Sequence, residues 1–141
     1  MTDVSKALKA RIAEQAGNRC GYCLSEQKYV YAPLEIEHIV PKGRGGKTIE
    51  ENLWLACPMC NRFKGHQIYG IDPKTNRRVR LFNPRSQKWK RHFKFSETGE
   101  EIIGRTITGR ATVVALQLNN RIAIAARRDW IRVGWFPPPD Y

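Results

Sequence analysis

The sequence contains no run of about 18 apolar residues, the length that a membrane-spanning helix needs. Its first six residues lack the basic, apolar and cleavage regions of a secretory signal. We therefore expect no membrane partner and a cytoplasmic location. Cysteines are also few, since there are four in the chain. In a reducing compartment such thiols act as metal ligands more often than they form disulfides.

Acidic residues are scarce. The 141-residue chain has 13 Asp and Glu against 25 Lys and Arg, which gives a formal charge of +12. A positive field of this size favours a polyanionic partner. Nucleic acid is a better candidate than anionic lipid, and also better than the view that the charge serves only solubility. Apolar residues make up 41% of the chain, which is enough for a core and argues against disorder.

The first half of the chain predicts an ordered series of elements. Apolar spacing indicates a helix over residues 4–15, which Gly17 and Asn18 end. Residues 34–40 alternate apolar and polar and stop at Pro41, so they predict a strand, and residues 53–56 predict a second one. Between them lies a basic glycine-rich loop, residues 42–47. A helix is expected from Pro58 to Gly65.

Two CxxC pairs flank this series. Cys20 and Cys23 precede the first strand, and Cys57 and Cys60 open the helix after the second strand. Four thiolates in this spacing suit tetrahedral zinc, which would join the start of the hairpin to the head of the helix. We considered free buried or redox-active thiols as the alternative, but nothing in the sequence resembles a thioredoxin unit.

Residues 20–66 resemble the HNH nuclease motif with embedded zinc ligands, as found in small bacterial or phage stand-alone proteins. The resemblance rests on the order Glu37-His38, Asn52-Leu53 and Cys60-Asn61 within this zinc framework. It implies an α+β fold that contains a ββα-metal (His-Me finger) motif. A leading helix and an α+β C-terminal extension would complete the fold.

The resemblance also implies roles. His38 would be the general base that activates water, and a neutral imidazole suits that role near pH 7. Glu37 and Asn61 would hold a catalytic Mg²⁺ or Mn²⁺, and their hard oxygen donors suit these ions. Asn52 would steady the loop by bonding to its backbone. Glu35 is either an acid that supports the metal site or a solvated strand charge.

Strict strand alternation would turn Glu37 and His38 to opposite faces, so the roles above require the strand to end or twist there. Phosphate contacts are expected from basic residues of the loop and of the helix, although each could be an ordinary surface charge. These residues are Lys42, Arg44, Lys47, Arg62 and Lys64.

The C-terminal half mixes cations with aromatic residues. It could form a groove that stacks bases, but we favour a small core built from Phe82, Trp89, Phe93 and Phe95. Short strands are expected around residues 80–82 and 92–95, a turn at 72–76, and helices from a Thr108 cap and over residues 121–130. Residues 81–89 and 108–112 are similar to the tail of small bacterial HNH proteins.

Together these features predict a nuclease segment over residues 1–70 and a basic extension over residues 71–141, packed into one domain. The predicted activity is metal-dependent hydrolysis of phosphodiester bonds in DNA, with RNA as the second choice of substrate. Structural Zn²⁺ and catalytic Mg²⁺ or Mn²⁺ are the expected cofactors. The alternative is a zinc-dependent module that binds nucleic acid without cutting it. The oligomeric state does not follow from the sequence.

Overall fold

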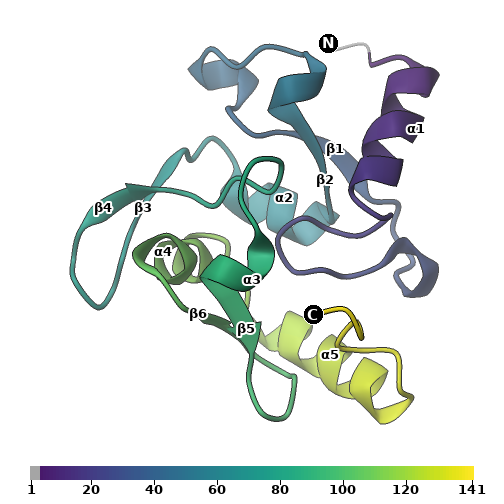
Figure 1. The fold of residues 1–141 in the computed structure, drawn as a ribbon, viewed down its shortest axis with the longest axis vertical. Helices are drawn as coiled ribbons and strands as arrows, with labels where there is room; N and C mark the ends of the chain where they lie inside the picture. The colour runs from purple at the N-terminus through teal and green to yellow at the C-terminus, as the bar shows by residue number, and fades with distance from the viewer. Residues whose placement is uncertain (1–3) are drawn as a thin grey trace. The chain divides into compact units, whose positions relative to one another are not determined.

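The computed structural model describes residues 4–141, which form two compact units (Figure 1). The first unit extends to Ile68 and includes Asn83–Ser86, and the second comprises Tyr69–Phe82 and Gln87–Tyr141. The boundary after residue 70, and the packing of both parts into one domain, stay predictions. The return of residues 83–86 to the first unit was not predicted. Within residues 4–141, no helix is both long and apolar enough to cross a membrane.

The first unit is built from a hairpin and two helices. Helix α1 (Lys6–Gln15) is capped by the Ser5 side chain, β1 (Glu35–His38) pairs antiparallel with β2 (Leu53–Ala56), and α2 (Pro58–Lys64) follows directly. Short 3-10 turns lie at Gln27–Tyr29, Lys42–Arg44 and Glu50–Asn52. The predicted order of strand, loop, strand and helix is therefore confirmed.

Helix α2 begins and ends where the sequence predicts. The Cys57 sulfur accepts a hydrogen bond from the Cys60 N–H at 3.4 Å, so one cysteine also caps the helix. Pro58 occupies the first turn, where its missing N–H costs nothing. Gly65 ends the helix with φ of 51°, a backbone conformation that favours glycine.

Residues 83–86 fasten onto the first unit through Arg85. Its Nε donates to the Leu53 carbonyl at 3.1 Å, and its Nη2 donates to the Gln15 side chain at 2.8 Å. The guanidinium also lies 5.0 Å from the ring centre of Trp54. A cation that the sequence places among many surface charges thus joins α1 to β2.

The second unit contains two small hairpins and three helices. Strand β3 (Tyr69–Ile71) pairs with β4 (Arg78–Arg80), and β5 (Phe93–Phe95) pairs with β6 (Ile102–Gly104), both antiparallel. The helices are α3 (Trp89–His92), α4 (Ile107–Ala115) and α5 (Arg121–Arg132). Two expectations were wrong in detail: the N-cap of α4 is Thr106 instead of Thr108, and residues 81–82 lie beyond β4.

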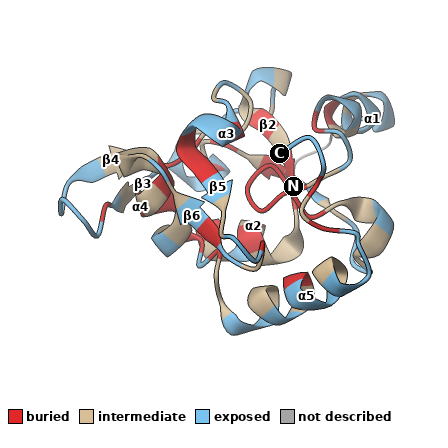
Figure 2. Cartoon of the chain, turned by 60° about the horizontal axis from the view of Figure 1, so that its bottom comes forward, coloured by how far each residue is buried: buried red, intermediate tan, exposed pale blue. Residues whose placement is uncertain are grey.

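Aromatic residues form the core of the second unit, as expected. Phe82, Trp89 and Phe93 are buried, and the rings of Phe82 and Phe93 meet edge to face with centroids 5.1 Å apart. Phe95 is half-buried against Trp89. These side chains are therefore not available to stack on bases. In Figure 2 the buried positions are drawn red.

Candidate functional site

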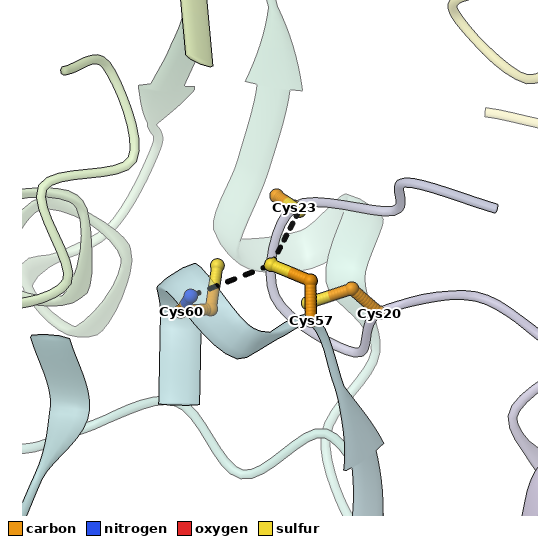
Figure 3. Close-up of side chains that lie close together, drawn as sticks. All are labelled: Cys20, Cys23, Cys57 and Cys60. Carbon is orange, nitrogen blue, oxygen red and sulfur yellow. Dashed lines mark hydrogen bonds between the residues drawn. The ribbon is translucent and has the colours of Figure 1, made fainter. Parts of the chain in front are cut away.

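The four cysteines meet at the junction of the hairpin and α2. Their sulfur atoms all lie within 4.8 Å of one another, and the side chains from the turn after α1 and from the head of α2 face each other (Figure 3). Sulfurs held tetrahedrally at a Zn–S length of about 2.3 Å lie roughly 3.8 Å apart, and the Cys23 and Cys57 sulfurs are 3.8 Å apart. The donor set and spacing are therefore compatible with zinc.

Hydrogen bonding among the thiols sets their acidity. Bonds from Cys20 and Cys57 hold the pKa of the Cys23 thiol well below its usual value, whereas burial raises the pKa of the Cys20 thiol. A bound cation would favour the thiolate at each position.

A cavity of about 400 Å³ opens beside β1 and the start of α2. Its lining includes residues from the strand, from the glycine-rich loop and from the helix, among them Glu35, Glu37, His38, Lys42, Asn61, Arg62 and His66. The cavity therefore brings together residues from all three parts of the ββα unit.

His38 reaches this cavity from the last position of β1. Its Nε2 lies 2.9 Å from the Thr48 hydroxyl, and the residue is only partly exposed. Burial lowers the pKa of the imidazole from its ordinary 6.5, and the nearby Lys42 and Lys64 cations lower it further. The neutral ring is thus favoured around neutral pH, as a proton acceptor requires.

Asn52 closes the loop that carries Thr48. Its Oδ1 accepts from the Val40 N–H at 2.8 Å, and its Nδ2 donates to the carbonyls of Val40 and Lys47 at 3.0 and 2.9 Å. Gly46 is required in this loop because a Cβ there would lie 1.7 Å from the Val40 carbonyl oxygen. Asn52 therefore bonds to backbone on both sides of the loop.

Glu37 does not face the solvent. It is 1% exposed, its carboxylate accepts a hydrogen bond from the Tyr22 hydroxyl at 2.7 Å, and it lies 3.5 Å from the Lys64 ammonium. Lys64 in turn donates to the carbonyls of His38 and Ile39 at 3.1 and 2.9 Å. Burial raises the pKa of the Glu37 carboxyl, and the Lys64 charge and the Tyr22 hydrogen bond oppose that rise.

The strand was expected to end or twist at Glu37 and His38, and β1 does end at His38. Both residues stay in regular register, with Glu37 opposite Trp54 and His38 opposite Leu53. Their side chains consequently point to different faces, Glu37 toward Tyr22 and His38 toward Thr48.

Glu35 and Asn61 meet instead. The Asn61 side chain donates to Glu35 Oε1 at 2.8 Å, and Glu35 is exposed at the start of β1. The sequence left open whether Glu35 is a supporting acid or a solvated charge. Its contact with Asn61 makes it part of the site.

The basic residues divide into two groups. Lys42, Arg44, Lys47 and Arg62 are exposed, so they remain candidates for phosphate contacts. Lys64 is 3% exposed and bonds to protein carbonyls, so the expected contact with nucleic acid does not fit its position. A solvent-facing cation was expected because Lys is rarely buried without a partner.

Two residues of the site were missed in the sequence. Thr48 contacts the His38 ring, and Tyr22 contacts Glu37. Tyr22 lies between Cys20 and Cys23, where its bulk and hydroxyl were a usable signal. Thr48 lies in a polar loop, and nothing in its surroundings along the chain marks it.

Residues 20–67 match the family model described as HNH endonuclease. Neither the curated proteins nor the solved structures contain a match to the chain. The match spans the four cysteines, the hairpin and α2, so the features compared above all lie within it.

The buried ion pair predicts a strong effect of Lys64→Met on stability. Removing the ammonium leaves the Glu37 carboxylate buried without its cation, which should lower the free energy of unfolding by about 3–5 kcal/mol. Adding Glu37→Gln should recover a large part of this loss. Urea denaturation of both single variants and the double variant measures it, with Arg62→Met on the exposed face of α2 as the control. A loss no larger than that of the control would show that Lys64 is not the counterion.

The environment of His38 predicts a response to Lys42→Ala. Removing a nearby positive charge makes the imidazolium easier to form, so the pKa of His38 should rise toward its ordinary value. Histidine NMR titration without added divalent metal measures this pKa. His92 provides an internal reference, because its pKa is lowered by burial and by Arg91. An unchanged His38 pKa would contradict the assignment.

Proposed function

We propose that the protein, whose residues 20–67 carry an HNH domain, is a metal-dependent endonuclease that hydrolyses phosphodiester bonds in DNA. The observation that carries the proposal is the placement of His38 and Asn61 in one cavity of the ββα unit. The net charge of +12 supports a polyanionic substrate.

His38 is the proposed general base. Its Nε2 contacts the Thr48 hydroxyl, so in the tautomer that donates this bond Nδ1 carries the free electron pair. Nδ1 would accept a proton from the water that attacks phosphorus. Asn52 supports this geometry by holding the loop on which Thr48 lies. Lys64 supports it by bonding to the His38 carbonyl.

A divalent ion fits beside Asn61. Glu35 Oε1 lies 2.8 Å from the Asn61 amide nitrogen, and rotation of that amide would present a second oxygen donor at the same place. Mg²⁺ and Mn²⁺ prefer such oxygen donors and retain several waters. When bound, the ion would supply charge neutralisation at the leaving oxygen.

The sequence assigns the acidic ligand to Glu37, but the contacts favour Glu35. The Glu37 carboxylate is buried, and both of its oxygens lie close to the Tyr22 hydroxyl. To bind a hydrated ion it would have to leave Tyr22 and Lys64. Glu35 requires only the rotation of the Asn61 amide, since it is already exposed beside Asn61.

The cysteine cluster is the proposed structural zinc site. Cys20, Cys23, Cys57 and Cys60 leave no open ligand position, because four thiolates complete a tetrahedron. The zinc would therefore join the turn after α1 to the head of α2 without taking part in the reaction.

The second candidate is a zinc module that binds nucleic acid without cutting it. The burial of Glu37 favours it, since the acid that the motif predicts as a ligand is occupied by the protein itself. The two candidates differ in one measurable property, which is cleavage.

The test is incubation of the purified protein with supercoiled plasmid and Mg²⁺ or Mn²⁺. We expect nicked or linear DNA from the parent and a loss of at least about 100-fold in rate for His38→Ala, the usual scale of a general base. Both proteins should contain one zinc per chain, which confirms that the variant is folded. A structured RNA serves as the comparison substrate. If the protein binds DNA but cuts neither the plasmid nor the RNA with either metal, the binding module is the better account.

The acid assignment predicts different effects for two matched variants. Glu35→Gln should weaken Mn²⁺ binding measured by electron paramagnetic resonance, and Glu37→Gln should leave it near the parental affinity while lowering stability. The reason is that only the first change removes an exposed oxygen charge beside Asn61. Loss of Mn²⁺ binding in Glu37→Gln alone, with zinc retained, would restore Glu37 as the ligand.

A further inference from the structure

The β3–β4 hairpin of the second unit has one exposed face. Tyr69 pairs with Arg80, and Ile71 pairs with Arg78, so alternation places these four side chains on the same side of the ribbon. All four are exposed, whereas Gly70 and Val79 between them are partly covered. Figure 2 shows the turn that joins the strands in pale blue, the colour of exposed residues. We call this face the basic ribbon.

The opposite face of the hairpin is fixed against α4. A Cβ on Gly70 would lie 3.3 Å from the Ala111 carbonyl oxygen and 3.4 Å from the Ala111 Cβ, so the strand packs directly on the helix. The ribbon cannot turn over without losing this packing. Its outer side chains are therefore held toward solvent on a rigid support.

Positive charge on the ribbon has no acidic balance. Residues 69–80 contain four cations, and all of them are exposed: Lys74, Arg77, Arg78 and Arg80. The single acid in this stretch, Asp72, is buried and accepts two hydrogen bonds from the Arg110 guanidinium at 2.8 and 3.0 Å. Arg110 holds the pKa of the Asp72 carboxyl far below its usual range. Asp72 thus anchors the turn and does not neutralise the exposed face.

Tyr69 orients the ribbon's arginines. The Arg78 guanidinium lies 4.0 Å from the centre of the Tyr69 ring, and that of Arg80 lies 6.0 Å from it. A guanidinium held over a ring keeps its N–H groups available while losing side-chain freedom before a ligand arrives. Arginine forks arranged in this way suit phosphate oxygens, which they bind in pairs.

We propose that the basic ribbon is a docking surface for the sugar–phosphate backbone of duplex DNA. A two-stranded β-ribbon is narrow enough to enter the major groove, where side chains along its edges reach phosphates on both sides. The choice of DNA rests on the proposed function, whereas the surface itself rests on charge, register and rigidity. It lies outside the cavity that contains His38 and would hold the polymer without taking part in cleavage.

The test measures binding apart from cleavage. In a His38→Ala background, Arg78→Glu/Arg80→Glu is compared with Arg121→Glu/Arg132→Glu on α5, which makes the same change in net charge. Fluorescence anisotropy with a 20-base-pair duplex of about two helical turns is recorded over a range of salt concentrations. The ribbon variant should lose at least about tenfold in affinity, and its slope of log K against log salt should fall by about 2, because two phosphate contacts are removed. The α5 variant should keep the parental slope.

Arg78→Gln/Arg80→Gln provides a milder variant in case charge reversal disturbs folding, and melting temperatures check both. Equal slopes for the ribbon and α5 variants would overturn the proposal. The proposal would also be overturned if the ribbon variant lost as much binding to anionic phospholipid vesicles as to DNA, or if it lost more binding to duplex RNA than to DNA. A failure of the proposed function alone would give another result. The protein that retains His38 would then bind DNA through the ribbon and leave it uncut.

Discussion

The buried ammonium of Lys64 is the contact on which the rest of the first unit depends. It joins the end of α2 to β1, because it pairs with Glu37 and donates to the carbonyls of His38 and of Ile39 just beyond the strand. Glu37 extends the connection to Tyr22, which lies between Cys20 and Cys23 of the cysteine cluster. A charged group this far from water is tolerated only when its partners replace the lost hydration. Any shift of helix, strand or cysteine turn would break that replacement.

This network explains why the acids of β1 have different surroundings. Glu37 is used to balance Lys64, and Glu35 is left at the surface beside Asn61. His38 lies on the other side of the strand from Glu37, with its ring held by Thr48 and its main chain held by Lys64. Glu37 and Lys64 therefore fix the geometry of this region, and Glu35 and the His38 ring are the groups left for the proposed chemistry.

The second unit has its own core and a basic surface. Phe82, Trp89 and Phe93 are buried in this core, so these three rings are not available to stack on bases. Among these cations, Arg78 and Arg80 stand out because Tyr69 orients them and α4 supports the strand beneath. A rigid basic ribbon is a better polyanion contact than the same charges on a loose loop, since less side-chain entropy is lost on binding.

The sequence by itself determined the order of elements in the first unit, the grouping of four cysteines in a set compatible with zinc, and the choice of His38, Asn52 and Asn61 as candidate site residues. It did so because local signals suffice for these features: Pro58 and Gly65 bound a helix, alternation marks a strand, and paired CxxC spacing marks a metal site. The tertiary structure alone decided which charges are buried. Glu37 and Lys64 read as solvated or catalytic charges along the chain, and Thr48 carries no signal at all. Their roles arise from neighbours distant in sequence, Tyr22 for Glu37 and the carbonyl of Ile39 for Lys64, and such contacts exist only once the hairpin, helix and cysteine turn have packed together.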